Sequence, residues 1–417
     1  MKSGEQFQIT ITDLAFGGDG VARTPDGGVI FIPYTAVGDE ILATVTQVRK
    51  NFARGEVAAI IKPAPERCAP QCRLYGKCAG CQYQHLEYAA EFAAKQKQLR
   101  DLLRRIGGFN ELPEFDIAFA APQQYGYRNK LRLEPAFMEL PGVEGERLVY
   151  GYYGSDNKTL IRVTNCPLAN DVINDDILDA IHSDWGRANA KKKKKKNDER
   201  PGAITLRATA EGKLAYYFGY APKRVPWLQE RLNDLEYSVP LGSFWQVNPA
   251  VAGKLVGRVA QWLEPKDSIE TFIDAYAGVG TFTCAMKNAF KERLLIENDR
   301  EAAKAAEFNV VNRHQFGCQI IPETTEKALP KLLKKCNAPS TAVLLDPPRI
   351  GCQSVVIDAL RNCRPAVVAY VSCNPATLAR DLKALCANGD YHLDKLAIFD
   401  MFPRTAHFET AVLLSAR

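Results

Sequence analysis

Cys373 is the residue of this chain best placed to act as a nucleophile. It lies in the run Val371-Ser372-Cys373-Asn374-Pro375, directly after an apolar, β-branched segment that begins at Ala366. Such a segment predicts a buried strand, and the Asn-Pro pair predicts a turn after it. Ligands of open α/β sheets bind at the carboxyl ends of strands, so this thiol is expected at a reactive position. A lone cysteine is more often a buried structural residue, so the residues around Cys373 in the fold must decide whether it is catalytic.

Those neighbours come from the last third of the chain, where strands and helices are expected to alternate from residue 241. Expected strands at 269–276, 293–296 and 341–345 end in Asp274-Ala275-Tyr276-Ala277-Gly278-Val279-Gly280-Thr281, in Glu297 and in Asp346-Pro347-Pro348-Arg349. Two glycines after a strand let the backbone approach a ligand, although Gly-x-Gly alone is weak evidence. A carboxylate at the end of the next strand can accept hydrogen bonds from ribose hydroxyls. With two further strands at 395–400 and 407–414, the pattern predicts a Rossmann-like methyltransferase sheet of about seven strands.

A second group of chemically active residues lies in the region before this sheet. Cys72, Cys78 and Cys81 are separated by five and two residues, in a chain with twelve cysteines and no apolar secretion signal at its start. These features favour metal ligation or catalysis in a reducing cytoplasm over a disulfide framework. Thiolates hold either tetrahedral zinc or an iron–sulfur cluster, and spacing does not separate the two. Cys166 is the best remote fourth ligand, and Cys68 is an alternative to one of the three.

Three domains are expected to position these groups. Residues 1–62 carry several short alternating strands with glycine turns, which is typical of a small barrel of OB type. The sequence Lys62-Pro63-Ala64-Pro65 makes a stiff boundary. Residues 63–240 form a central domain with an amphipathic helix at 87–106, and residues 241–417 form the domain with the α/β sheet.

Basic residues occur in both of the first two domains. Lys50, Arg54 and Lys62 flank Phe52, and Arg128, Lys130 and Arg132 stand in an expected strand at 125–133 beside two tyrosines. Either group would serve as an RNA-facing surface or as a solvated strand. The run Lys191–Lys196 predicts a mobile loop with nonspecific attraction to phosphates.

Composition limits the class of protein without choosing a function. The chain has 417 residues, 46% apolar and 24% charged residues, and a formal net charge of +6. These values are those of a globular protein, and the mild positive charge permits a polyanionic partner without demonstrating one. No run of about 18 apolar residues occurs, so no membrane-spanning helix is expected.

Six motifs in one order resemble the RNA (uracil-5-)-methyltransferases, in particular the iron–sulfur branch that acts on 23S ribosomal RNA. The resemblance covers essentially the whole chain, including a TRAM-type barrel at the amino end. The motifs are Cys72-x5-Cys78-x2-Cys81, Phe244-x-Gln246-x-Asn248, Asp274 to Thr281, Asp346-Pro347-Pro348-Arg349, Ser372-Cys373-Asn374-Pro375 and His407-Phe408-Glu409.

The resemblance implies a role for each motif. It makes Cys373 the nucleophile and Glu409 the base, with S-adenosylmethionine and a 4Fe–4S cluster as cofactors. The implied S-adenosylmethionine contacts are Gln246, Tyr276, Gly278, Gly280, Glu297 and Asp346, and the implied cluster ligands are Cys72, Cys78, Cys81 and Cys166. The implied fold is a multidomain α/β protein: a Rossmann-like class I methyltransferase domain, a central α+β iron–sulfur domain and an amino-terminal OB-like barrel. Thr281 and Pro348 depart from the family's frequent asparagine and alanine, which concerns the fine cofactor contacts.

The implied reaction explains why these residue types are needed. Uracil C5 becomes nucleophilic once a thiolate has added to C6, and a base must then remove the C5 proton. The target base must also leave its stack, at a cost of roughly a few kcal/mol, which favours single-stranded loops as substrates. The cysteine group favours ribosomal over transfer RNA, and we expect a cytoplasmic monomer that does not bind membranes.

The sequence also allows other hypotheses about function. Cytosine-5 RNA methyltransferases pair two cysteines at the ends of the fourth and fifth strands, but here Cys352 comes after the Asp-Pro-Pro-Arg motif. Amino-group methyltransferases carry an aromatic residue where Arg349 stands. A noncatalytic RNA-binding iron–sulfur protein would have no use for Glu409, which by itself could be a surface carboxylate.

Overall fold

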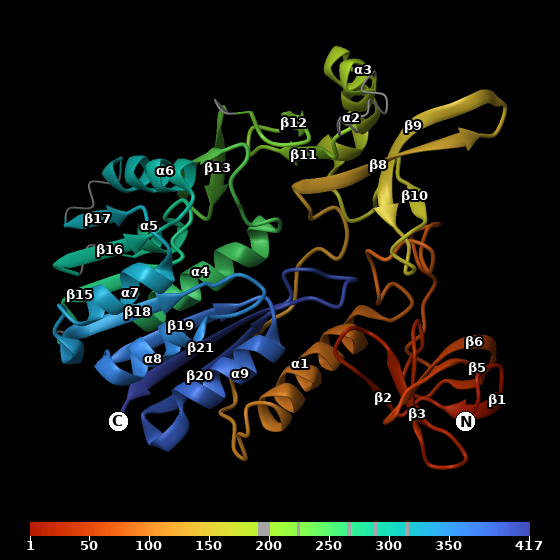
Figure 1. The fold of residues 1–417 in the computed structure, drawn as a ribbon, viewed down its shortest axis with the longest axis horizontal. Helices are drawn as coiled ribbons and strands as arrows, with labels where there is room; N and C mark the ends of the chain where they lie inside the picture. Colours follow the sequence, from red (N-terminus) through yellow and green to blue (C-terminus); the bar gives the residue numbers. More distant parts are fainter. Residues whose placement is uncertain (191–200, 223–225, 265–267, 287–289, 313–316) are drawn as a thin grey trace. The chain divides into compact units, whose positions relative to one another are not determined.

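The computed structural model describes residues 1–190, 201–222, 226–264, 268–286, 290–312 and 317–417. The expected loop Lys191–Lys196 lies outside these residues. The chain forms two compact units, and each is described by itself. Unit 1 comprises Met1–Leu99, Leu133–Leu168 and Phe402–His407, and unit 2 comprises Arg100–Arg132, Ala169–Met401 and Phe408–Arg417. Figure 1 shows the order of the elements along the chain.

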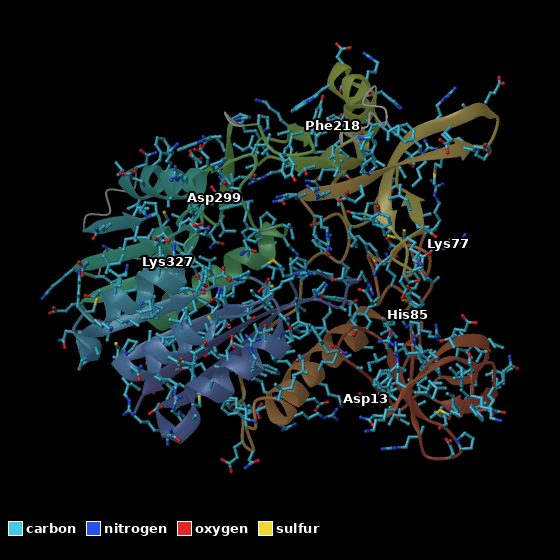
Figure 2. The ribbon with its side chains drawn as sticks, viewed as in Figure 1. Asp13, Lys77, His85, Phe218, Asp299 and Lys327 are labelled. Carbon is cyan, nitrogen blue, oxygen red and sulfur yellow. The ribbon has the colours of Figure 1, made fainter. Side chains whose placement is uncertain are left out.

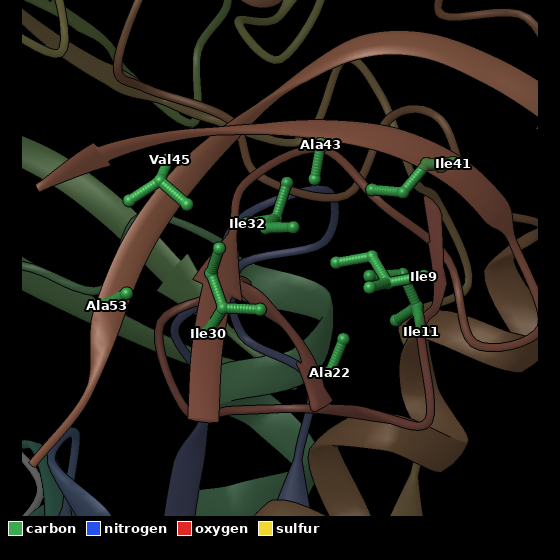
Figure 3. Close-up of a cluster of buried hydrophobic side chains, with 9 residues drawn as sticks. All are labelled: Ile9, Ile11, Ala22, Ile30, Ile32, Ile41, Ala43, Val45 and Ala53. Atoms are coloured by element: carbon green, nitrogen blue, oxygen red, sulfur yellow. The ribbon is translucent and has the colours of Figure 1, made fainter. Parts of the chain in front are cut away.

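Unit 1 begins with a six-stranded sheet of order β1-β5-β6-β4-β3-β2. Its strands are β1 (Gln6–Thr10), β2 (Asp13–Leu14), β3 (Gly20–Arg23), β4 (Val29–Ile32), β5 (Glu40–Val48) and β6 (Ala53–Lys62). Because side chains alternate across a strand, the apolar residues of each strand gather on one face. They form a common core, drawn in Figure 3, of Ile9, Ile11, Ala22, Ile30, Ile32, Ile41, Ala43, Val45 and Ala53. The expected β-rich amino-terminal part is confirmed.

The rest of unit 1 includes the cysteine-bearing loop at 63–87 and the first part of α1 (Tyr88–Arg105). It also includes, from Leu133 onward, the antiparallel hairpin of β8 (Lys130–Leu140) and β9 (Val143–Tyr153). The short strand β10 (Leu160–Arg162) pairs with β9. The helix expected at 87–106 is confirmed as α1.

Unit 2 is built on an eight-stranded sheet of order β17-β16-β15-β18-β19-β21-β20-β7. Its strands are β7 (Phe115–Phe119), β15 (Thr271–Ala275), β16 (Glu292–Ile296), β17 (Cys318–Ile321), β18 (Thr341–Leu345), β19 (Val367–Ser372), β20 (Tyr391–Phe399) and β21 (Glu409–Ala416). The strand β21 runs antiparallel to both of its neighbours. About seven strands were expected, and six of these strands were placed from the sequence; β17 was not. The eighth, β7, comes from the region assigned to the central domain and pairs with β20 in parallel.

Helices connect the parallel strands of this sheet, as the alternating pattern predicts. They are α5 (Thr281–Ala285), α6 (Arg300–Val311), α7 (Thr325–Leu333), α8 (Ser354–Cys363) and α9 (Pro375–Leu385), with short 3-10 turns at Ala338–Ser340 and Ala387–Gly389. A further helix, α4 (Pro249–Leu263), precedes β15. The α/β architecture expected for the last third of the chain is therefore confirmed.

Most of the remainder of unit 2 lies between β7 and β15 in the sequence. It contains α2 (Asp171–His182), α3 (Asp184–Ala190), the hairpin of β11 (Ile204–Ala208) and β12 (Leu214–Phe218), and the hairpin of β13 (Trp227–Leu232) and β14 (Leu235–Pro240). In the part of the chain that the structure describes, no helix is both long and apolar enough to cross a membrane.

Candidate active site

Three predicted site residues lie at the same edge of the sheet in unit 2, each at or next to the end of a central strand. Ser372 of β19 pairs with Thr410 of β21, so that Cys373 follows β19 beside Glu409, the first residue of β21. On the other side of β19, Leu345 pairs with Tyr370, and Asp346 follows directly. Cys373 is half-buried, and Glu409 is 7% exposed. The strand register thus brings together a thiol and two carboxyl groups.

Burial, with the neighbouring carboxyl groups, raises the pKa values of the ionisable groups in this site. Burial raises the pKa of Cys373 to about 11, with the Glu409 and Asp346 carboxyls acting in the same direction. Burial and then Asp346 raise the pKa of Glu409 well above its usual value. The pKa of Asp346 rises to about 7, through burial and the nearby Asp274. Each of these groups therefore resists ionisation until a ligand or a cation compensates the charge.

Arg349 supplies such a cation. Its guanidinium forms a hydrogen bond with Cys373 and lowers the pKa of that thiol by both the bond and its charge. The same charge lowers the pKa of Glu409. In the sequence, Arg349 stands out only as part of the motif Asp346-Pro347-Pro348-Arg349. Its position directly after two prolines at a strand end was the signal for a functional role.

The turn that carries Cys373 is fixed by its neighbours in the motif. Asn374 N donates to Ser372 Oγ at 3.1 Å, and Asn374 Oδ1 accepts from Ala376 N at 3.1 Å at the start of α9. Asn374 Nδ2 donates to the carbonyl of Arg349 at 3.0 Å. Pro375 suits the first turn of a helix because it has no N–H to satisfy. Asn374 thus caps α9 and links the cysteine turn to the Arg349 loop.

The glycine loop after β15 is built around Glu297. Gly278 N donates to Glu297 Oε2 at 2.7 Å, and Asp299 N donates to Glu297 Oε1 at 2.7 Å. Asp299, labelled in Figure 2, caps α6. Gly278 and Gly280 have φ values of 57° and 81°, which glycine adopts without steric cost. The carboxylate therefore holds the loop in place and keeps lone pairs for a ligand's hydroxyls.

Tyr276 lies in the same loop in a conformation that costs energy. Its φ is 66°, in the left-handed region that a bulky residue rarely adopts. Its hydroxyl donates to Glu326 Oε1 at 3.1 Å. Such strain is characteristic of ligand-binding loops that the surrounding fold holds in position.

The segment around Gln246 is anchored by its backbone. Gln246 is 7% exposed, and its carbonyl accepts from Asn129 Nδ2 at 3.0 Å. Asn248 caps α4 and donates from Nδ2 to the carbonyl of Met401 at 3.3 Å. Phe244, by contrast, is 69% exposed. The motif thus alternates an exposed aromatic ring with two buried amides.

The four predicted cluster ligands lie in unit 1, away from the residues described above in sequence. Cys72, Cys78, Cys81 and Cys166 are half-buried. Cys78 forms an isolated β-bridge with Gly154. Within the described ranges, however, no three or more histidine, cysteine, aspartate or glutamate side chains are grouped so that they could hold a metal ion. The geometry does not support the cluster, which stays a prediction.

His85, labelled in Figure 2, has a structural role in the same loop. It is buried, its Nδ1 contacts the hydroxyl of Tyr75, and its Nε2 lies 3.0 Å from the carbonyl of Thr35. Burial lowers its pKa to about 4, so it is neutral at physiological pH.

Comparison with known proteins adds to this geometry. Residues 225–417 match the family model described as tRNA (Uracil-5-)-methyltransferase, and residues 2–58 match the TRAM domain. A protein of Synechocystis sp., described as an uncharacterized RNA methyltransferase, is 32% identical over 100% of this chain and 96% of its own length. A protein of Nostoc sp. with the same description is 32% identical over 99% of this chain and 96% of its own length.

One solved structure shares the fold over nearly the whole chain. It is the Pyrococcus abyssi tRNA (uracil-54, C5)-methyltransferase in complex with S-adenosyl-L-homocysteine. The similarity has a TM-score of 0.71 at 23% identity and covers 98% of this chain and 99% of that one.

Proposed function

The chain belongs to the RNA (uracil-5-)-methyltransferase family, and on that premise we propose that it methylates C5 of a uridine in RNA through Cys373 and Glu409. S-adenosylmethionine, when bound, supplies the methyl group. The observation that carries the proposal is the position of the Cys373 thiol beside the Glu409 carboxyl at the end of one strand pair.

Each residue then has a defined step. Cys373 loses its proton to solvent, which Arg349 favours by lowering the pKa of the thiol, and the resulting thiolate adds to C6 of the uracil. The ring takes up the methyl group at C5, and Glu409, as the carboxylate that the Arg349 charge favours, accepts the C5 proton. The electrons of that C–H bond restore the C5–C6 double bond and expel the thiolate from C6. A carboxylate with a raised pKa is a stronger base, which suits Glu409 to this proton transfer.

We propose that the predicted cofactor residues keep their assigned roles. Glu297 would hold the ribose hydroxyls, and the backbone at Gly278 and Gly280 would approach the cofactor closely. Asp346 would face the positively charged sulfonium, and Gln246 and Tyr276 would complete the pocket. The support is that Glu297 accepts short hydrogen bonds from the loop backbone, and that burial and the nearby Asp274 raise the pKa of Asp346, a rise that a cation at that position would offset.

The first test is tritium release from RNA labelled at uracil C5, in the presence of S-adenosylmethionine. Wild type should release tritium and Cys373→Ala should not. Cys386→Ala is a matched control, because burial also raises the pKa of Cys386 to about 11 but that residue ends α9. Equal release by wild type and Cys373→Ala would contradict the mechanism. No release by either protein, with intact RNA binding, would favour the noncatalytic alternative.

The same assay decides the class of RNA. We propose 23S ribosomal RNA on the basis of the cysteine spacing, with RNA contacts from the TRAM segment and from residues 63–240. The description of the matching family model favours transfer RNA instead. Separate ribosomal and transfer RNA transcripts should be offered, and release only from the transfer RNA transcript would overturn the ribosomal assignment.

The proposed cluster needs its own measurement. We propose that Cys72, Cys78, Cys81 and Cys166 bind a 4Fe–4S cluster; the support is their spacing in the sequence and their position in one unit. Anaerobically purified protein should contain iron and acid-labile sulfide, which Cys78→Ser should lose and Cys363→Ser should retain. A colourless, zinc-containing protein would contradict this assignment.

A further inference from the structure

We propose that a cavity in unit 1 binds an unpaired nucleobase of the RNA substrate, at a site separate from the residues that act on the target uridine. The cavity has a volume of about 250 Å³, against roughly 10–15 Å³ for one water molecule. Three segments far apart in the sequence line it. They contribute Asp19, Tyr34 and Arg54 from the β-rich part, Ala79 and Gln82 from the cysteine-bearing loop, and Ser155 from the turn between β9 and β10. The inference rests on the proposed function only for the identity of the partner as RNA.

The walls of this cavity are fixed by hydrogen bonds within unit 1. Gln82 Nε2 donates to the carbonyl of Ala79 at 2.8 Å, and Gln82 Oε1 accepts from Ala406 N at 2.9 Å. Ala79 N donates to the carbonyl of Tyr153 at 3.4 Å, which ties the cysteine-bearing loop to β9. A pre-formed site loses little conformational entropy on binding, so this cavity is suited to capture a ligand without rearrangement.

The turn that carries Ser155 and the glycine loop opposite are also constrained. Asp156 accepts hydrogen bonds from Lys158 N and Thr159 N, both at 2.9 Å. Gly18 has a φ of 98°, and a Cβ there would lie 2.7 Å from Gln82 Cβ. The loop can therefore pass this close to Gln82 only because it carries glycine.

The side chains in the cavity match a flat, neutral ligand with hydrogen-bonding edges. Tyr34 is half-buried, and its ring is held by an edge contact with Tyr75 at a centroid distance of 5.2 Å. Arg54 Nη1 lies 3.1 Å from Asp19 Oδ2, so donors and acceptors stand side by side. Unpaired bases are recognised by an aromatic face together with polar groups that reach their edges.

The ion pair of Arg54 with Asp19 makes a phosphate a poor ligand for this cavity. The Asp19 carboxylate partly compensates the Arg54 guanidinium, and it would repel a phosphate oxygen at that position. A neutral base meets no such repulsion, and stacking on an aromatic ring is compatible with any base. The chemistry of the cavity therefore favours a base over the backbone of the RNA.

The test compares two labelled probes of equal charge. One is a fluorescein-labelled single-stranded RNA of mixed sequence, and the other is an abasic ribose-phosphate oligomer of the same length. Fluorescence anisotropy without S-adenosylmethionine gives Kd for both. Tyr34→Leu should weaken binding of the RNA about 5- to 150-fold and leave binding of the abasic oligomer unchanged. Tyr34→Phe should bind both probes as wild type does.

A second variant keeps the test valid if Tyr34→Leu folds poorly. Ser155→Trp places a large side chain in the cavity from an exposed turn and should give the same selective loss. Arg23→Ala removes an exposed cation of β3 outside the cavity lining and should leave the ratio of the two Kd values unchanged. Equal losses for both probes would show a phosphate contact and overturn the proposal, as would no loss for either probe.

These outcomes are independent of the proposed reaction. Tritium release with unchanged binding by Tyr34→Leu and Ser155→Trp would leave the methyltransferase function in place and remove the base site. Selective loss of RNA binding in a protein that releases no tritium would retain the base site and remove the reaction.

Discussion

Cys373 and Glu409 stand beside one another because β19 and β21 run antiparallel, with Ser372 paired to Thr410. The nucleophile ends one strand and the base begins the other. In a purely parallel sheet the carboxyl ends of both strands would lie at this edge. Here the carboxyl end of β19 lies beside the amino end of β21. The position of β21 between β19 and β20 thus completes the site with a residue from near the end of the chain.

Replacing the base should trap the reaction after addition. In Glu409→Gln the thiolate still adds to C6 and the methyl group is still transferred, but the amide cannot accept the C5 proton. We expect turnover to fall by about 10²- to 10⁴-fold and a covalent protein–RNA complex to accumulate. Denaturing gel electrophoresis with labelled RNA measures the complex. Glu292→Gln, at an exposed carboxylate of β16, should behave as wild type; a Glu409→Gln enzyme with normal turnover would exclude Glu409 as the base.

Arg349 should set the pH dependence of the reaction. Burial raises the pKa of Cys373 to about 11 and Arg349 opposes this rise, so activity should increase with pH as more thiolate forms. Arg349→Met removes a charge-assisted hydrogen bond, and we expect the rate at neutral pH to fall about 10- to 150-fold. The profile should move to higher pH, and Arg349→Lys should restore part of the shift. Tritium release measured across the pH range tests this; a parallel fall at every pH would contradict it.

Asp274 should make the folded protein less stable at alkaline pH. It is fully buried, and burial raises its pKa to about 7 from about 3.9 in an unfolded chain. Because the pKa of Asp274 is higher in the folded protein than in the unfolded chain, the protonated carboxyl stabilises the fold at pH values below the unfolded pKa. This stabilisation is lost as the pH rises through about 7.

The substitution Asp274→Asn replaces the ionisable carboxyl by a neutral amide, so stability should no longer fall with pH at this position. Above neutral pH it should raise the free energy of unfolding by up to about 4 kcal/mol relative to wild type, and the gain should disappear in acid. Thermal unfolding at several pH values measures the difference. Asp175→Asn, at an exposed carboxylate of α2, should show no such trend; an equal gain at all pH values would mean that the substitution acts through packing.

Lys95 should stabilise unit 1 through a buried ion pair. Lys95 and Glu91 are fully buried one turn apart in α1, with Nζ 2.7 Å from Oε1. Glu91 also accepts from Arg404 N at 2.7 Å, which anchors the segment Phe402–His407 just before Glu409 in the sequence. Lys95→Met leaves the buried Glu91 carboxylate without its lysine but still with the Arg404 guanidinium, 3.4 Å from Oε2, and we expect a loss of no more than about 3–5 kcal/mol.

A matched control lies two residues along the same helix. Lys97 pairs with Asp13 at 2.7 Å, but its side chain is 54% exposed. Lys97→Met should therefore cost less than about 1 kcal/mol. Urea unfolding followed by fluorescence gives the free energy of unfolding of the two variants. Similar losses in both would show that burial does not make the Lys95 ion pair more important for stability than the exposed pair.

The sequence alone determined the parts of this protein that depend on local pattern. Runs of apolar, β-branched residues specified the strands β15, β16, β18 and β19, because a strand buried on both faces needs such side chains at every position. The residue after each run then had to lie at the sheet edge, which identified Glu297, Asp346 and Cys373 as site candidates. The glycines after β15 indicated a close backbone turn for the same local reason.

Only the tertiary structure decided which of these residues meet. The contact of Cys373 with Arg349, the place of Glu409 beside them and the addition of β7 to the sheet all depend on pairing between distant segments. The cysteine spacing likewise predicted a metal site, whereas the described side chains form no such group. Spacing along a chain fixes which residues share a loop or a strand end. Strand order and side-chain direction follow from the packing of the whole unit, which no local window of sequence contains.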